Sequence, residues 1–202
     1  MTLEYTGRQL WYQAEVTELL EYMTMLLWDN CIDFWLDCGQ LLGAMRNGRA
    51  VPWDYDADIS CFESDIKKIE ALSYTIKTDG YNSTSIKRGQ RTHVFKIWKQ
   101  NPDFHLDIWP CFIDEQSIVR NIHIGFFHVP LIDLTHMQSI MYEGVDYPCP
   151  DNTLQLIESR YGKDWKTYFE VMASSIKLMK KYDPTNLEII NYIQDNKLVI
   201  KQ

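Results

Sequence analysis

The N-terminal part of the chain has the spacing of an amphipathic helix, followed by that of a strand. Over residues 8–30, apolar side chains recur at steps of three and four. They are Leu10, Ala14, Leu19, Leu20, Met23, Leu26 and Leu27. The period changes to two over 31–37, where Ile32, Phe34 and Leu36 alternate with Asp33, Trp35 and Asp37. We therefore predict a helix over 8–30 and then a strand with one buried face.

The same pattern predicts a turn, a short helix and a second strand further along. Gly39 is expected to form the turn, and a short helix is expected over 40–47. Polar and apolar positions alternate again over 55–62, which predicts a strand with Asp56 and Asp58 on the same face. After it, the polarity pattern predicts a helix over 65–72 that is capped by the Ser64 side chain.

The middle of the chain predicts a loop and further strands. The polar stretch 78–92 is expected to be an exposed loop. Two strands are expected over 94–99 and 104–109, joined by a turn at 101–103, and another strand is a candidate over 117–125.

Beyond Pro150 the pattern returns to helix. A helix over 153–161 is expected to be capped by Asp151 or Asn152 and ended by Gly162. Two more helices are expected over 164–180 and 184–195. Helix, mixed sheet and C-terminal helices together predict an α+β fold. No repeat, low-complexity tract or linker divides the chain, so we expect a single domain over 1–202.

Charge and cysteine content exclude several classes of protein. Lys and Arg number 20 against 28 Asp and Glu, for a net charge of −8. This charge repels nucleic acid and anionic lipid, so neither is expected as a partner. No segment approaches the roughly 20 apolar residues of a transmembrane helix, so we expect a soluble, cytoplasmic protein. The 5 cysteines have no C-x-x-C spacing, which favours buried free thiols over disulfides or a zinc site.

Three carboxylates on two predicted strands are the most informative feature. The alternation places Asp56 and Asp58 on one face, about 7 Å apart along the backbone. In the later strand, Asp107 shares a face with His105 and Trp109. Like charges this close require a counter-ion, and a divalent cation held by these carboxylates satisfies them. A solvated acidic face is the alternative.

The spacing of the acidic residues also resembles a calcium-binding EF-hand loop, which the details exclude. Four residues occupy loop positions one, three, five and seven, namely Asp54, Asp56, Asp58 and Ser60. The sixth position of that loop requires Gly but is Ile59, and the twelfth is Asp65 instead of Glu.

A carboxylate cluster preceded by a glycine-containing turn at a helix start indicates metal-assisted chemistry at phosphate. Divalent ions neutralise phosphate oxygens, and the backbone N–H groups at a helix N-terminus hold a phosphate. Three basic residues in the polar loop, Lys87, Arg88 and Arg91, could form a lid over that phosphate; ordinary solvated loop charges are the alternative.

Aromatic and imidazole side chains admit two interpretations each. Trp53, Trp98 and Trp109 could form a cation–π cage for a quaternary ammonium group, or they could pack in the core. His93 and His105 could ligate a metal or act as acid and base, or they could simply be hydrogen-bonded within the sheet.

Three sequence motifs resemble the LicD/fukutin family of the nucleotidyltransferase superfamily. They are FWLDCGQLLGAMRNGRAVPWDYDADIS at 34–60, HLDIWP at 105–110 and YPCPDN…RYGKDW at 147–165. They stand in the family's order and span 30–166, which leaves 1–30 and 167–202 as helical flanks. The resemblance implies the mixed sheet of polymerase-beta-like nucleotidyltransferases. It also implies transfer of a phosphoalcohol from a CDP-linked donor to a sugar hydroxyl with Mg²⁺ or Mn²⁺.

The resemblance also assigns roles to residues. Asp56 and Asp58 match the paired metal ligands, and Asp107 matches the third ligand or the base for the acceptor hydroxyl. The positions that would bind the donor are Gly39 and Gln40 in the phosphate-holding turn, Arg46 after the short helix, and Trp53 with Asp54. Gln40 departs from the family, which usually has Thr or Ser there, so an amide or the backbone must replace a hydroxyl contact.

We therefore expect a metal-dependent transferase with a CDP-alcohol donor, such as a phosphocholine or ribitol phosphate donor, and a glycan or glycolipid acceptor. Two alternatives stay open: nucleotidyl transfer with release of pyrophosphate, and a non-catalytic relative that binds metal or nucleotide as a scaffold. If the chain is an excised domain, the lumen of the secretory pathway replaces the cytoplasm as its expected compartment.

Overall fold

The fold was analysed in a computed structural model. It describes residues 11–51, 53–120, 128–130, 134–166, 170–172, 177–178, 181 and 199–201. Within the described residues, no helix is long and apolar enough to cross a membrane.

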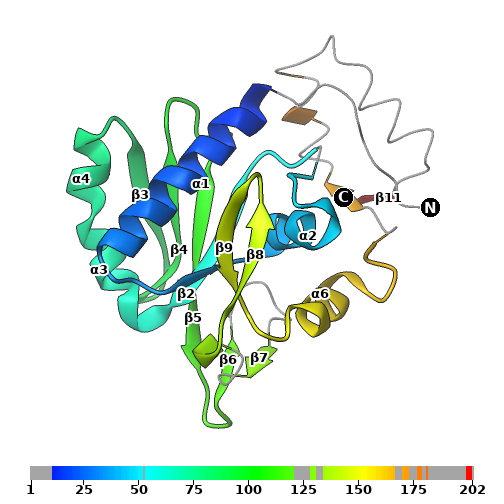
Figure 1. Cartoon of the computed structure of the whole chain (residues 1–202). Coiled ribbons are helices and arrows are strands. Elements are labelled where there is room, and N and C mark those ends of the chain that lie inside the picture. The colour runs from blue at the N-terminus through cyan, green and yellow to red at the C-terminus, as the bar shows by residue number, and fades with distance from the viewer. Residues whose placement is uncertain are drawn as a thin grey trace.

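A mixed sheet forms the centre of the molecule (Figure 1). Its strand order is β1-β2-β5-β4-β3, and β6 and β7 continue from β5. The strands are β1 (Phe34–Leu36), β2 (Ala57–Phe62), β3 (Asn82–Arg88), β4 (Arg91–Trp98), β5 (Leu106–Ile113), β6 (Ile118–Arg120) and β7 (His128–Pro130). β2 and β5 are parallel, and the other pairs are antiparallel. The sheet is therefore mixed, as the sequence predicted.

Helices flank this sheet, which completes the predicted α+β fold. They are α1 (Trp11–Asp29), α2 (Cys38–Asn47), the short 3₁₀ turn η1 (Glu63–Asp65), α3 (Ile66–Ala71), α4 (Ser73–Thr78) and α6 (Thr153–Tyr161). α1, α3 and α4 pack on the β2–β5–β4–β3 part of the sheet, whereas α2 and α6 lie near its β1 end (Figure 1).

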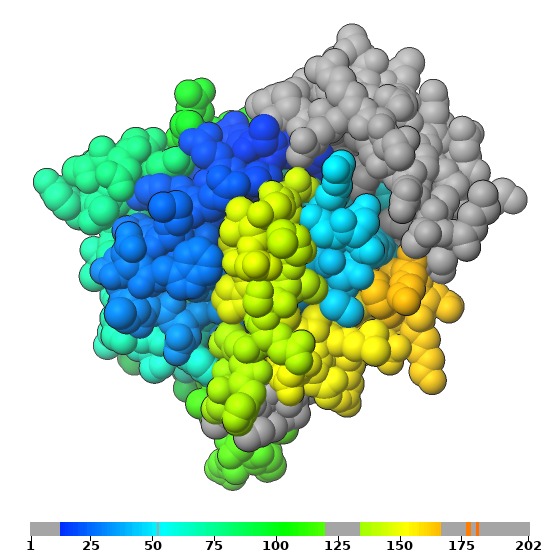
Figure 2. Space-filling model, in the orientation of Figure 1, coloured from blue at the N-terminus to red at the C-terminus, as the bar shows by residue number. Residues whose placement is uncertain are grey.

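Two small sheets complete the described structure. β8 (Gln138–Tyr142) and β9 (Val145–Cys149) form a hairpin, and β10 (Glu170–Met172) pairs in parallel with β11 (Val199–Lys201). Figure 2 shows α1, the β8–β9 hairpin and α2 side by side on one face of the molecule.

The helix predicted over 8–30 is confirmed as α1, and its residues 8–10 lie outside the described residues. Its apolar stripe is buried against the sheet. Leu19, Leu20, Met23 and Leu27 are each at most 1% exposed. Because these side chains pack against β2 and β5, α1 is part of the core.

The first strand is confirmed at Phe34–Leu36, but the prediction of one buried face is wrong. Trp35 and Asp37 are as buried as the residues that alternate with them. β9 packs against this strand, and Arg160 from α6 contacts Asp37, so both faces are covered. Coverage from distant parts of the chain is not visible in local alternation.

The loop predicted over 78–92 is instead the hairpin of β3 and β4, closed by a two-residue turn at 89–90. Gly89 has a φ of +61°, a conformation that glycine adopts at little cost. β3 is polar because it is the edge strand and most of its side chains face water. Its register with β4 shifts between Ile86 and Lys87. Polar composition was therefore misleading for this strand.

Several helix ends differ from the prediction. Asp37 caps α2, so Gly39 lies in the first turn of the helix and does not form a separate turn. Ser64 lies within η1 and makes no side-chain cap for α3. The side chain of Asn152 also makes no cap for α6, but Gly162 ends that helix as expected.

The remaining elements are confirmed in part. The two strands predicted over 94–99 and 104–109 form the antiparallel pair β4 and β5. Residues 118–120 of the candidate strand 117–125 form β6, and 121–125 lie outside the described residues. The helix predicted over 164–180 is wrong at Glu170–Met172, which is β10. The helix predicted over 184–195 lies outside the described residues.

All 5 cysteines are free thiols, as the sequence indicated. Cys61, Cys111 and Cys149 are buried, Cys38 is partly buried, and Cys31 is exposed at the end of α1. The expectation that all five are buried is therefore wrong for Cys31.

Candidate active site

A row of three ionisable side chains crosses the sheet. In the parallel pair of β2 and β5, Asp58 lies directly opposite Asp107. In the antiparallel pair of β5 and β4, Asp107 lies directly opposite Lys96. Since paired residues of neighbouring strands point to the same face, these three side chains share one face of the sheet.

Asp107 forms a close ion pair with Lys96. The Lys96 Nζ lies 2.7 Å from Oδ1 and 2.8 Å from Oδ2 of Asp107, so the ammonium group contacts both carboxylate oxygens. Asp107 is 5% exposed, and the side chain of Lys96 is 25% exposed. The pair is thus largely withdrawn from water, where a charge without a partner is costly.

Asp58 is held by a neighbour on β5. The indole Nε1 of Trp109 donates a hydrogen bond of 2.7 Å to Asp58 Oδ1. Burial, together with the charge of Asp107, raises the pKa of Asp58 to about 8. The carboxyl group of Asp58 therefore favours its neutral form unless a cation comes close.

Two further carboxylates precede β2 in the chain. Asp54 and Asp56 are hydrogen-bonded to each other, and burial raises the pKa of Asp54 to about 6. Burial and the charge of Asp58 raise the pKa of Asp56 well above its ordinary value. Gly39 makes room for this pair, because a Cβ atom there would lie 1.9 Å from Asp54 Oδ2.

Gln40 fixes the backbone that carries these acids. Its Nε2 donates to the carbonyl oxygen of Asp56 at 2.9 Å, and its Oε1 accepts from the backbone N–H of Asp58 at 2.6 Å. The amide thus bridges both ends of the segment at the start of β2. The Gln40 side chain thus hydrogen-bonds to the protein's own backbone in this structure.

Asp37 and Arg160 support the site from behind. Asp37 caps α2 by accepting from the backbone N–H of Cys38, and it also accepts from the Ser60 hydroxyl at 2.6 Å. Arg160 of α6 donates to the same carboxylate. Although burial opposes it, the charge of Asp37 raises the pKa of Arg160 above its ordinary value, so the guanidinium group stays charged.

His105 faces the carboxylates with its Nε2 atom. That atom lies 3.7 Å from Asp56 Oδ2 and 3.7 Å from Asp107 Oδ1. The Nδ1 atom lies 2.9 Å from the carbonyl oxygen of Pro102, to which it donates when it carries the proton. Burial lowers the pKa of His105, so its neutral form turns a lone pair on Nε2 toward the acids.

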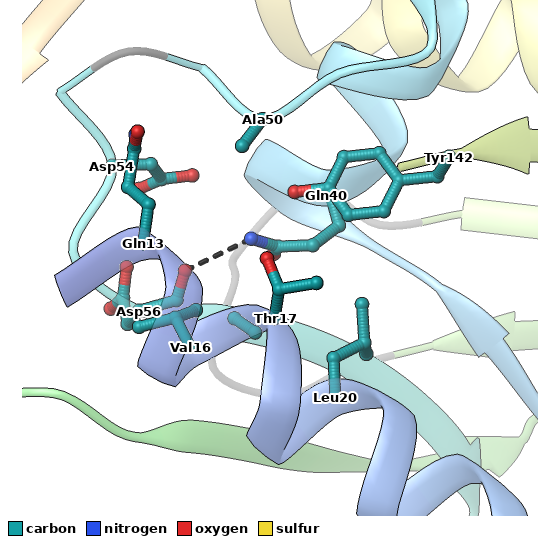
Figure 3. Close-up of a pocket in the computed structure, with 10 residues that line it drawn as sticks. Gln13, Val16, Thr17, Leu20, Gln40, Ala50, Asp54, Asp56 and Tyr142 are labelled. Atoms are coloured by element: carbon teal, nitrogen blue, oxygen red, sulfur yellow. Dashed lines mark hydrogen bonds between the residues drawn. The ribbon is translucent and has the colours of Figure 1, made fainter. Parts of the chain in front are cut away.

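A small pocket opens beside Asp54 and Asp56 (Figure 3). Residues of α1 form one wall, and α2, β8 and the segment before β2 form the others. The lining residues are Gln13, Val16, Thr17, Leu20, Gln40, Ala50, Asp54, Asp56, Ala57 and Tyr142. Polar atoms of Gln13 and Thr17 therefore lie near the acids, although α1 precedes all three sequence motifs.

The donor atoms at this site fit a hard divalent ion. Carboxylate oxygens are the ligands that Mg²⁺ and Mn²⁺ prefer, and Asp56, Asp58 and Asp107 are the residues that would hold them. Within the described part of the chain, no three Asp, Glu, His or Cys side chains already converge as a ligand set. Lys96 supplies the positive charge at Asp107 in this structure.

Three of the predicted residues also have partners elsewhere in the structure. Arg46 donates through Nε and Nη2 to the backbone oxygen of Trp165, at 3.1 Å and 2.5 Å. Trp53 is 4% exposed and packs in the hydrophobic core. Trp109 contacts the ring of His93 edge-on, with centroids 5.7 Å apart.

The predicted phosphate lid lies at the far end of the β3–β4 hairpin. Arg91 begins β4, where its guanidinium lies 3.5 Å from Glu63 and over the ring of Phe112. Lys87 and Arg88 on β3 pair with this same end of β4. Lys96 is five residues further along β4, which is roughly 17 Å. The structure therefore does not bring these three basic residues to the carboxylates.

Sequence reasoning missed three kinds of contributor: Lys96, the wall of α1, and Arg160. A signal for Lys96 was available, because the predicted strands 94–99 and 104–109, paired end to end as a hairpin, place Lys96 opposite Asp107. Arg160 opens the motif RYGKDW that carries the resemblance, which marks the residue but not its partner Asp37, and no signal marks Thr17. Both contacts depend on how helices pack onto the sheet.

Comparison with known proteins identifies relatives of this chain. A profile described as LicD/FKTN/FKRP, nucleotidyltransferase domain matches residues 31–152. The chain is 24% identical over 154 residues to ribitol 5-phosphate transferase FKRP of Mus musculus, and 23% identical to that of Homo sapiens. These matches cover 72% of this chain but only 31% and 30% of the two relatives, so the chain corresponds to less than a third of their length.

Two solved structures also show similarity. The lincosamide antibiotic adenylyltransferase LnuA has a TM-score of 0.47 and 17% identity, covering 69% of this chain and 82% of its own. The antibiotic-resistance factor ANT(2'')-Ia has a TM-score of 0.49 and 12% identity, covering 89% and 98%.

The profile match carries the assignment. It covers more than half of the sequence and includes the three carboxylates of the predicted site, Asp56, Asp58 and Asp107. This chain belongs to the LicD/FKTN/FKRP nucleotidyltransferase-domain family.

Proposed function

We propose that this protein transfers a phosphoalcohol from a CDP-linked donor to a sugar hydroxyl of a glycan or glycolipid and releases CMP. Ribitol phosphate is the transferred group to test first, since the curated relatives are ribitol 5-phosphate transferases. Phosphocholine is the second, because the family resemblance of the sequence implies it. The observation that carries the proposal is the close grouping of Asp54, Asp56, Asp58 and Asp107 at the start of β2 and on β5. Burial and the charges of neighbouring acids raise the pKa values of Asp56 and Asp58.

These carboxylates suit a reaction at a diphosphate. A bound Mg²⁺ or Mn²⁺ would neutralise the phosphate oxygens and the charge that develops on them. Asp56, just before β2, and Asp58, on β2, would hold the ion from one side, and Asp107 would hold it from β5. Buried acids with raised pKa values are a common feature of such sites, because ligand or proton binding relieves their mutual repulsion.

The groups of this chain would act on the acceptor and the donor as follows. Asp107 orients the acceptor hydroxyl and accepts its proton. The acceptor oxygen forms a bond to the phosphorus that carries the alcohol, and the bond from that phosphorus to the oxygen of CMP breaks. The first turn of α2, after the Asp37 cap, offers backbone N–H groups to a phosphate of the leaving CMP.

The proposal is tested by incubating the protein with CDP-ribitol, CDP-glycerol or CDP-choline, Mg²⁺ or Mn²⁺, and a panel of p-nitrophenyl glycosides. We expect CMP release with at least one donor. Asp58→Asn should reduce the rate by about 10²-fold or more while the protein stays folded. Asp146→Asn, which changes an exposed carboxylate on β9, should leave the rate unchanged.

The products separate the alternatives. Release of pyrophosphate from CTP or ATP would support nucleotidyl transfer instead. Calorimetric binding of metal and CDP without turnover of any donor would support a non-catalytic relative. Full activity of the Asp58→Asn variant would overturn the assignment of the carboxylates.

A further inference from the structure

We propose that Lys96 is an exchangeable counter-cation of the site: it neutralises Asp107 before a divalent ion binds, and afterwards it contacts a phosphate of the donor. The inference rests on the proposed function, because it requires a divalent ion and a diphosphate substrate at these carboxylates. It adds a donor-binding residue that lies outside the motifs at 34–60 and 105–110.

The position of Lys96 is fixed by strand pairing. β4 and β5 are antiparallel, and Lys96 is the direct partner of Asp107 in their register. The backbone therefore places the ammonium group beside that carboxylate however the surrounding loops are arranged. Its neighbours Phe95 and Ile97 point to the opposite face and are buried in the core, which anchors the strand.

The contact occupies both oxygens of Asp107. Nζ lies 2.7 Å and 2.8 Å from them, and Asp107 is nearly buried. A divalent ion that binds Asp107 must take over at least one of these oxygens. Because two cations repel each other at such a distance, the ion loosens or displaces the ammonium group.

The other acids of the site are also held by hydrogen bonds within the protein. Trp109 holds one oxygen of Asp58, and Asp54 is hydrogen-bonded to Asp56. Among the described residues, no three candidate ligands converge on one point. The indole N–H of Trp109 at Asp58 and the ammonium group of Lys96 at Asp107 occupy oxygens that an ion would take over.

A released Lys96 stays beside the site. A quarter of its side chain is exposed, so its four-carbon stem can turn toward solvent without opening the core. Arg46 donates to the backbone oxygen of Trp165, and Arg91 lies 3.5 Å from Glu63, so each has a partner of its own. Lys96 is therefore a cation that already lies beside these acids, where it can meet a donor phosphate.

The test compares Lys96→Met, which keeps the length of the side chain and removes its charge, with wild type. Mn²⁺ binding is measured by calorimetry without donor, and CDP binding is measured at saturating Mn²⁺. We expect Lys96→Met to bind Mn²⁺ on the order of tenfold more tightly, because no resident cation has to be displaced. We expect it to bind CDP on the order of tenfold more weakly, because a phosphate contact is lost.

Two further variants serve as controls. Lys99→Met removes a similar charge that pairs with exposed Glu18, and it should leave both affinities unchanged. Lys96→Arg keeps the charge and should bind Mn²⁺ no more tightly than wild type. Lys96→Arg retains a cation for Asp107, so it keeps the test usable if Lys96→Met does not fold. The exchange would be contradicted if Lys96→Arg kept its affinity for CDP but bound Mn²⁺ more tightly than wild type.

The outcomes distinguish this inference from the proposed function. If wild type binds Mn²⁺ and releases CMP, but Lys96→Met changes neither affinity, Lys96 is a fixed structural partner and the inference is overturned alone. If wild type binds neither Mn²⁺ nor CDP, the proposed function fails and the exchange fails with it.

Discussion

At the scale of single residues, Gln40 shows how one buried amide can set the geometry of two acids. It bonds to the backbone of Asp56 on one side and of Asp58 on the other. The side chains of these two acids depend on the backbone that Gln40 fixes. A residue whose hydrogen bonds position the backbone can therefore be as important for a site as one that contacts substrate.

We predict that Gln40→Ala destabilises the protein and weakens metal binding together. The change leaves a buried N–H and a buried carbonyl without their partner, which costs about 1–3 kcal/mol for each group. Urea unfolding and Mn²⁺ calorimetry measure the two effects. Gln90→Ala, at the exposed turn of the β3–β4 hairpin, is the control and should change neither. Unchanged unfolding of Gln40→Ala would show that its two hydrogen bonds are dispensable.

The raised pKa values of the acids predict how stability depends on pH. The pKa is about 6 for Asp54 and about 8 for Asp58, against an ordinary value of 3.8. The folded state therefore binds more protons than the unfolded state between about pH 4 and 8. This contribution to stability is fully present below pH 4 and is lost as the pH rises through 6 and then 8.

Without divalent ions, the melting temperature should accordingly fall as the pH rises across that interval. Mg²⁺ should restore it at the alkaline end, because an ion replaces the lost protons. Differential scanning calorimetry at several pH values measures both effects. Asp58→Asn should flatten the upper part of the profile, and a metal-free melting temperature that rises from pH 6 to 8 would count against these values.

At the scale of elements, α6 is joined to the site by one buried ion pair. Arg160 reaches the cap of α2 at Asp37, and Asp37 in turn bonds Ser60 of β2. Three elements that are distant in sequence therefore meet at one carboxylate. The matched family region ends at residue 152, before α6. The ion pair of Arg160 with Asp37 therefore connects the matched region to a helix that lies outside it.

We predict that Arg160→Met is strongly destabilising. It leaves the charge of Asp37 buried without its cation, a loss of about 3–5 kcal/mol for a buried pair. Chemical denaturation measures it, and Arg49→Met, at an exposed position, is the matched control. A loss below about 1 kcal/mol would mean that the Asp37 carboxylate is satisfied by its other hydrogen bonds.

Elements were predictable where local pattern and packing agree. Alternation located β2 and β5, and it placed Asp58 and Asp107 on facing strands. Alternation did not reveal β3, because this edge strand has the polar composition of a loop. It also did not reveal that both faces of β1 are buried, because residues distant in the sequence cover the second face. The metal assignment stays a prediction, while the Lys96 partner of Asp107 followed from the hairpin register and was overlooked.

At the scale of the whole molecule, α1 is the clearest departure from the family boundary. It precedes residue 31, where the profile match begins, yet it supplies core side chains and one wall of the pocket. A domain defined by sequence similarity alone would omit it. The folded unit is therefore larger than the matched region.

We predict that a fragment starting at residue 31 does not fold, as measured by circular dichroism and proteolysis. Point variants of the whole chain give the graded form of the test. Leu20→Ala should lower the free energy of unfolding by about 2–5 kcal/mol, because Leu20 is fully buried. Met25→Ala, on the exposed side of α1, should change it by less than about 0.5 kcal/mol. A folded fragment, or equal effects of the two variants, would contradict the role of α1.

The parallel pairing of β2 with β5 has a consequence for how the protein matures. Between these strands the chain must first build α3, α4 and the β3–β4 hairpin. Until these elements have folded and β5 has paired with β2, Asp58 and Asp107 are far apart and no ion can bridge them. Uptake of a divalent ion during refolding would thus report the moment at which the central strands join, and the free energy of that uptake would favour the completed sheet over any partly assembled form.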